Sequence, residues 1–102
     1  MTIVGDWDVT IKTPIGLLSA TYTFIQADGG WSGTATLKGD TAVLQNISVD
    51  GDRVTWQQSV TKPMRLNLDF DVVVRGGELT GHSRAGRLPR SAVTGTRRDE
   101  VV

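Results

Sequence analysis

Several residue types and patterns are missing from this chain, and each absence removes a class of function. The sequence contains no cysteine, which excludes disulfides, thiolate metal sites and a cysteine nucleophile. It has one histidine, His82, so a site of several histidines is excluded and no metal site is expected. Eleven Lys and Arg residues balance eleven Asp and Glu residues, so the basic excess that favours nucleic-acid binding is absent.

Signals for export and for membrane insertion are missing as well. Residues 1–7 contain no basic segment followed by an apolar one, so no signal peptide is expected. No apolar run approaches the roughly 18 residues that a membrane-spanning helix needs. No cofactor motif is recognisable, and no cofactor is expected. These observations predict a cytoplasmic protein that binds neither membranes nor nucleic acid.

What the sequence does contain is a regular succession of short segments and turns. Turns rich in glycine or proline recur seven times, and apolar and polar residues alternate with period two between them. The eight expected strands are 5–13, 17–27, 31–37, 42–49, 53–61, 65–75, 78–85 and 91–98. We therefore predict one all-β domain at 1–98, followed by a short tail at 99–102. Its expected fold is a single up-and-down antiparallel meander of about eight strands that forms a small closed or nearly closed barrel.

The turn lengths predict which residues face one another across the hairpins. Loops of two residues at 76–77 and of four around 28–30 would place large side chains opposite small ones, as a narrow barrel requires. The expected pairs are Val74 with Leu79, Val72 with Gly81, Phe24 with Gly33, and Tyr22 with Ala35. A four-residue loop at 50–53 would place Gln45 opposite Gln58 and Ile47 opposite Trp56.

Two short motifs resemble the calycin group, which comprises lipocalins, fatty-acid-binding proteins and avidins. Gly5-Asp6-Trp7 is similar to the G-x-W signature of their first strand, and 27–34 is similar to a hairpin of avidin-like chains. The resemblance implies that Trp7 closes the base of the barrel and packs against a basic residue of the last strand, here Arg97. Most of avidin's polar ligand-binding set is missing, so biotin binding is not implied. The chain also resembles small bacterial barrel modules without an assigned role, which occur alone or appended to hydrolases.

The connections at the two ends of the predicted barrel differ in composition. The connections at 13–16, 38–41, 62–64 and 85–90 share one end, which holds all three prolines and the apolar residues Ile15, Met64 and Leu88. Seven cations lie there too: Lys12, Lys38, Lys62, Arg65, Arg84, Arg87 and Arg90. We interpret this end as a mouth for an apolar or aromatic acid, with Met64, Arg65, Arg84 and Arg87 as candidate ligand contacts. The alternative is solvated loop tips, with the apolar residues buried in a homodimer.

Polar residues at inward positions provide a second group of candidates. Tyr22, Gln45 and Gln58 would orient a ligand's polar group in a cavity lined by Trp31 and Trp56. In the alternative interpretation the amides bond each other or water, and the aromatic side chains fill the interior.

His82 is the one conventional acid–base residue, and the 76–77 loop would place Asp71 opposite it. A carboxylate beside an imidazole prepares a general base. Alternation puts both residues on the outer face, however, where such pairs are common and contribute little. His82 and Asp71 are therefore catalytic candidates only if the chain is an enzyme.

These observations leave three hypotheses open. The first is a barrel that binds a compact apolar or aromatic ligand carrying a negative charge. The second is a cofactor-independent enzyme of the isomerase, cyclase or hydratase type. The third is an accessory or interaction domain without a ligand, which a filled interior would favour.

Overall fold

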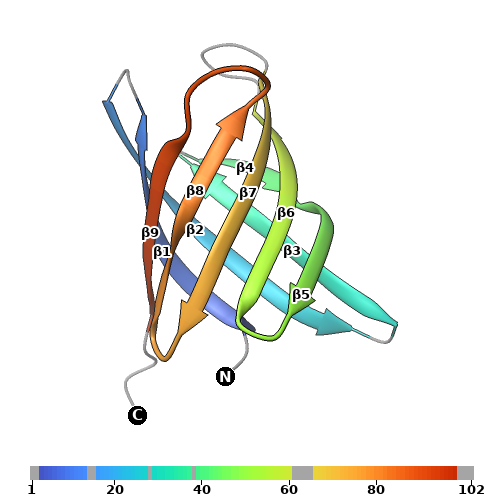
Figure 1. The fold of residues 1–102 in the computed structure, drawn as a ribbon. Helices are drawn as coiled ribbons and strands as arrows, with labels where there is room; N and C mark the ends of the chain where they lie inside the picture. Colours follow the sequence, from blue (N-terminus) through green and yellow to red (C-terminus); the bar gives the residue numbers. More distant parts are fainter. Residues whose placement is uncertain (1–2, 14–15, 28, 38, 61–65, 99–102) are drawn as a thin grey trace.

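The fold is known from a computed structural model, which describes residues 3–13, 16–27, 29–37, 39–60 and 66–98. Within these ranges the chain forms nine antiparallel strands (Figure 1). They are β1 (Gly5–Thr13), β2 (Gly16–Ala27), β3 (Gly30–Leu37), β4 (Asp40–Val43), β5 (Gln45–Asp50), β6 (Arg53–Val60), β7 (Leu66–Arg75), β8 (Glu78–Ala85) and β9 (Ser91–Arg97). The order in the sheet is β4-β3-β2-β1-β9-β8-β7-β6-β5, which confirms the predicted up-and-down meander.

The ninth strand arises from a break at Leu44. The strand expected at 42–49 is divided into β4, which pairs with β3, and β5, which pairs with β6. At the break the Leu44 amide donates a hydrogen bond to the Gly33 carbonyl at 2.9 Å, which holds this point of the chain against β3. Since β1 also pairs with β9, the barrel is nearly closed, and β4 and β5 are its two sheet edges.

The predicted registers of two hairpins are confirmed. Val74 pairs with Leu79, Val72 with Gly81, Phe24 with Gly33, and Tyr22 with Ala35. The glycines are required because the neighbouring strands come very close. A Cβ added at Gly81 would lie 2.1 Å from the Asp71 carbonyl oxygen, and one at Gly33 would lie 2.9 Å from the Thr23 carbonyl oxygen.

Aromatic side chains fill the middle of the barrel. Trp7, Tyr22, Phe24, Trp56 and Phe70 are each at most 2% exposed. The rings of Trp56 and Phe70 stack with centroids 4.9 Å apart, and Phe24 meets Trp56 edge-on at 5.1 Å. Such contacts add to the stabilisation from apolar burial, so this cluster is the centre of the core.

Trp7 and Arg97 are in contact at the end of the barrel where β1 begins and β9 ends. Trp7 pairs with Arg97 across β1 and β9, and the Arg97 guanidinium carbon lies 4.5 Å from the centroid of the Trp7 ring. The Trp7 indole donates to the Ile3 carbonyl at 2.8 Å, and Arg97 donates to the Val4 carbonyl. These contacts tie the segment before β1 to the last strand.

The strand directions also confirm the two distinct ends. The turns between β5 and β6 and between β7 and β8 lie at the end where β1 begins and β9 ends, and the loop at 86–90 lies at the opposite end (Figure 1).

The described part of the chain contains no helix long and apolar enough to cross a membrane. The cytoplasmic location stays a prediction.

Candidate functional site

Three polar side chains inside the barrel are bonded to one another. The Tyr22 hydroxyl donates to Gln58 Oε1 at 2.7 Å, and the Trp56 indole donates to the same oxygen at 3.3 Å. Among the described residues, no buried side-chain nitrogen or oxygen lacks a hydrogen-bond partner. The inward positions predicted for Tyr22, Trp56 and Gln58 are confirmed, and Gln58 Oε1 already accepts a hydrogen bond from each of the other two side chains.

Two other residues that were predicted to face the barrel interior are not buried there. Gln45 pairs with Gln57 rather than Gln58, and its side chain is exposed, so its predicted inward position is wrong. The cause is a β-bulge between Gln45 and Ser48, which inserts an extra residue and reverses the side-chain alternation. The predicted register of this hairpin holds from Asp50 with Arg53 to Ser48 with Thr55, and Ile47 lies within the segment where the register shifts. Trp31 is only half-buried and packs at the margin of the core.

The mouth predicted from the sequence is described only in part. Met64, Arg65 and Ile15 lie outside the described residues. Arg84, Arg87 and Leu88 are exposed at or near the 86–90 loop, and Arg84 Nε donates to the Leu88 carbonyl at 3.1 Å. Arg84 therefore also holds this loop in place.

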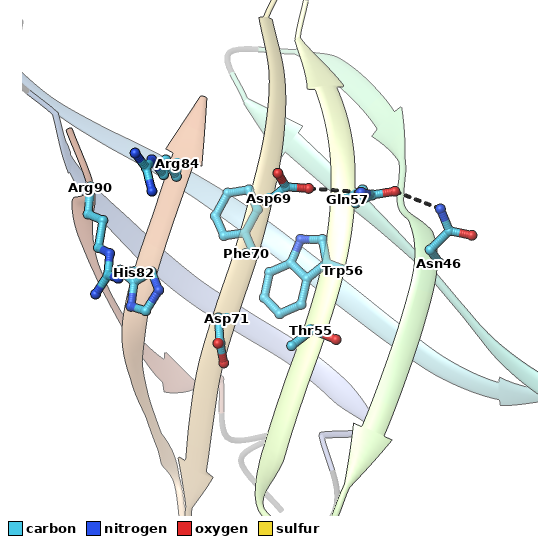
Figure 2. Close-up of a pocket in the computed structure, with 10 residues that line it drawn as sticks. All are labelled: Asn46, Thr55, Trp56, Gln57, Asp69, Phe70, Asp71, His82, Arg84 and Arg90. Carbon is cyan, nitrogen blue, oxygen red and sulfur yellow. Dashed lines mark hydrogen bonds between the residues drawn. The ribbon is translucent and has the colours of Figure 1, made fainter. Parts of the chain in front are cut away.

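A groove of about 470 Å³ lies on the outer face of β6, β7 and β8. Figure 2 shows its ten lining residues, which come from four strands and from the segment before β9. Trp56 and Phe70 contribute to the lining but are almost fully buried. The other lining side chains are polar: Asn46, Thr55, Gln57, Asp69, Asp71, His82, Arg84 and Arg90.

Both carboxylates of the groove are held by neighbouring side chains. Asp71 accepts two hydrogen bonds from Arg53, Nε to Oδ1 at 3.0 Å and Nη2 to Oδ2 at 2.6 Å. Asp69 accepts from Gln57 Nε2 at 2.8 Å, and Gln57 Oε1 in turn accepts from Asn46 Nδ2 at 2.6 Å. The hydrogen bonds from Arg53 lower the pKa of Asp71, so this side chain is a carboxylate near neutral pH.

The cations of the groove keep free donors. Arg84 uses only its Nε in a hydrogen bond to the loop. Within the described part of the chain Arg90 donates no hydrogen bond, although its charge contributes to the lowered pKa of Asp71. Figure 2 shows the Arg90 side chain extending beside His82. Guanidinium groups with free donors suit carboxylates and phosphates, so this wall of the groove is adapted to an anion.

The pairing of Asp71 with His82 is confirmed in register, as is that of Asp69 with Arg84. Asp71 forms its hydrogen bonds with Arg53, on the other neighbouring strand. The catalytic role of His82 and Asp71 stays a prediction. No three His, Asp or Glu side chains come together in a metal-binding arrangement within the described ranges.

Asn46 is a groove residue that the sequence analysis missed. It is the one non-glycine residue with positive φ among the described residues, at φ 53°. Asparagine tolerates this conformation better than most residues, and such backbone is often found at functional sites. Its strand sequence carries no glycine or turn signal, so nothing in the pattern predicts the bulge.

Comparison of the chain with models of known protein families, with curated protein sequences and with solved structures gave no significant match. The function must therefore be inferred from the residues of the site.

Proposed function

We propose that this chain is a binding module for a compact anionic ligand, held in the outer groove by Arg84 and Arg90. The observation that carries the proposal is the contrast between interior and groove. Inside the barrel, Gln58 Oε1 accepts hydrogen bonds from the Tyr22 hydroxyl and the Trp56 indole, whereas the Arg90 guanidinium in the groove donates no hydrogen bond within the described structure. A ligand's carboxylate or phosphate between Arg84 and Arg90 would complete their hydrogen bonding.

Of the two carboxylates in the groove, Asp71 has its charge neutralised by Arg53, and Asp69 lies opposite Arg84 on the neighbouring strand. Asp71 is paired with Arg53, and Asp69 accepts a hydrogen bond from Gln57. Their engagement leaves the Arg84 and Arg90 wall as the part of the groove with free donors. The lining side chains that solvent reaches are polar, so we expect the charge of the ligand to contribute more to affinity than its apolar body does.

The test compares acids with matched neutral esters. Benzoate and phenyl phosphate should raise the melting temperature and bind in calorimetry, whereas methyl benzoate should bind more weakly. Higher salt should weaken binding of the acids because the groove is open to solvent. Arg90→Gln should weaken acid binding by about 10-fold or more, since hydrogen bonds to charged groups contribute about 1.5–3 kcal/mol.

Arg75→Gln is the matched control, because Arg75 is exposed at the opposite end of β7. It should bind acids as the native chain does. Equal affinity for acids and esters, or unchanged affinity in Arg90→Gln, would contradict the anion site.

The filled interior also supports a second candidate function, an interaction domain without a small ligand. A cluster of four aromatic side chains, Tyr22, Phe24, Trp56 and Phe70, occupies the space where an internal ligand would lie. This candidate predicts that no acid in the panel stabilises the protein at any salt concentration. The same melting-temperature screen therefore separates the two proposals.

A further inference from the structure

Hydroxyl side chains form rows across the outer face on the other side of the barrel. In the first row, cross-strand pairing puts four threonines and one aspartate next to one another: Thr41, Thr36, Thr21, Asp8 and Thr96. The adjacent row consists of Ser19, Thr10, Thr94 and Thr80. Threonine is favoured in strands, so single residues of this kind carry no functional meaning. Their alignment over six neighbouring strands produces a surface with many hydroxyls and little charge.

A hollow of about 460 Å³ lies where these rows cross β1, β2 and β3. Its polar lining consists of Asp8, Thr10, Ser19, Thr21 and Thr36. β2 is separated from β7 in the sheet by β1, β9 and β8, so the hollow is distinct from the anion groove. Its volume is within the range of small-molecule sites.

The hydrogen bonds in the hollow distinguish its edges from its centre. Thr36 shares a hydrogen bond of 3.1 Å with Thr41, and Asp8 Oδ1 accepts from Arg98 Nη2 at 2.5 Å. By contrast, the hydroxyls of Thr10, Ser19 and Thr21 bond to no protein group in the described part of the chain. Three side chains that each donate and accept are therefore available to a ligand at the centre.

We propose that this hollow is a second binding site, which takes a neutral polyhydroxylated ligand such as a short oligosaccharide. Sugar hydroxyls also donate and accept, so they can pair with all three free side chains. The one charged lining residue, Asp8, is neutralised by Arg98, so the hollow gives an ion little net attraction. All six aromatic residues belong to the inward-facing series of positions, so no ring stacks on the sugar and we expect millimolar affinity.

The test is a titration of the ¹⁵N-labelled protein, followed by amide chemical shifts, with maltotriose and cellotriose as probes. Glycerol at equal hydroxyl concentration is the control for non-specific solvation. We expect saturable shifts at 8–10, 19–21 and 36 with at least one trisaccharide and no saturable shift with glycerol. Non-saturating shifts, or shifts equal to those with glycerol, would overturn the proposal.

Isosteric variants test the hydroxyls themselves. Thr21→Val and Thr10→Val keep the branched shape that strands favour but remove the donor and acceptor. Each should weaken trisaccharide binding by about 2- to 10-fold, the effect of losing one ordinary hydrogen bond. Thr80→Val, at the end of the same row, should bind as the native chain does. Affinity unchanged in both Thr10→Val and Thr21→Val would contradict the site.

The outcome is independent of the anion groove. Benzoate binding should be the same in Thr21→Val as in the native chain, because the two sites lie on different strands. Failure of one proposal therefore leaves the other standing. If the hydroxyl surface instead binds a second copy of the chain, sedimentation would show a dimer that Thr21→Val weakens and that trisaccharides do not affect, which would also overturn the proposal.

Discussion

Tyr22, the one tyrosine of the chain, has its hydroxyl bonded to Gln58 inside the barrel. Burial raises the pKa of this hydroxyl well above its ordinary value of about 10, because the phenolate would lose its solvation. The folded-state pKa is raised, so the corresponding stability is fully present below about pH 10. It is then lost progressively as the pH rises above that value, toward the folded-state pKa.

We therefore expect tyrosinate absorbance to appear only together with unfolding in a titration with base. Ultraviolet absorbance and far-ultraviolet circular dichroism, recorded on the same sample, would check this. A tyrosinate signal that develops near pH 10 while the circular dichroism remains native would show that solvent reaches Tyr22.

Trp7 is the second residue on which the fold depends. Its side chain is fully buried and lies beneath the Arg97 guanidinium. Trp7→Ala should lower the free energy of unfolding by about 3–5 kcal/mol, the range for removing a large aromatic side chain from a core. Trp31→Ala should lower the free energy of unfolding by clearly less, because Trp31 is only half-buried. Urea denaturation measures both, and a Trp7→Ala curve that matches the native one would contradict the base contact.

Alternation of inward and outward side chains predicts only some of the interior positions. The inward positions of Tyr22, Trp56 and Gln58 follow from period two along uninterrupted strands. The position of Gln45 departs from this pattern, because the bulge at Asn46 reverses the alternation. As a result Leu44, and not Gln45, lies in the core. A bulge depends on the packing of neighbouring strands, and neither Asn46 nor its neighbours mark it in the sequence.

Gly81 determines how closely strands β7 and β8 pack. An added Cβ would meet the Asp71 carbonyl oxygen at 2.1 Å and the Val72 Cα at 2.6 Å, both of them backbone atoms. Because backbone cannot rotate away, Gly81→Ala should destabilise the fold by about 3 kcal/mol, the upper end of the usual range for overpacking.

The control for this prediction is Gly77→Ala, since nothing lies within 4 Å of a Cβ built there. It should change the free energy of unfolding by no more than about 0.5 kcal/mol. Thermal or urea denaturation of both variants is the measurement. Equal stability of the Gly81 and Gly77 variants would show that β7 and β8 can separate without cost.

Most strands could be predicted from the sequence because turns with glycine or proline separate them. β1 and β8 have the predicted boundaries, and β7 and β9 differ from them by one residue. The division of 42–49 could not be predicted, because the segment contains neither glycine nor proline. The break at Leu44 reflects the exchange of one strand neighbour, β3, for another, β6, and this depends on closure of the whole barrel.

Exposed leucines near one end of the molecule bear on its assembly. Leu17, at the start of β2, is 66% exposed, and Leu88, in the loop before β9, is 55% exposed. The homodimer predicted from Ile15, Met64 and Leu88 stays a prediction, and its interface would also cover Leu17. We expect sedimentation at micromolar concentration to show a dimer, which Leu17→Ser with Leu88→Ser should dissociate. A single species of 11.0 kDa for the native chain would contradict it.

The groove itself is a feature of the whole molecule. Its lining comes from β5, β6, β7 and β8 and from Arg90 in the following loop, so no single segment of sequence contains it. The sequence did point to Arg84 and to the pairing of Asp71 with His82, because two-residue turns fix a register reliably. It could not show that Arg53 would engage Asp71, which depends on how β6 pairs with β7.

In the proposed function an anion binds in the outer groove and not among the interior aromatic side chains. The most direct measurement is a titration of the ¹⁵N-labelled protein with phenyl phosphate, followed through amide and indole chemical shifts. We predict saturable shifts at 55–57, 69–71, 82–84 and Arg90, which in Arg90→Gln should need about 10-fold more ligand or more to reach half of their full size. Shifts concentrated at Tyr22, Gln58 and the Trp56 indole, or an unchanged titration in Arg90→Gln, would show that the anion does not bind in the groove.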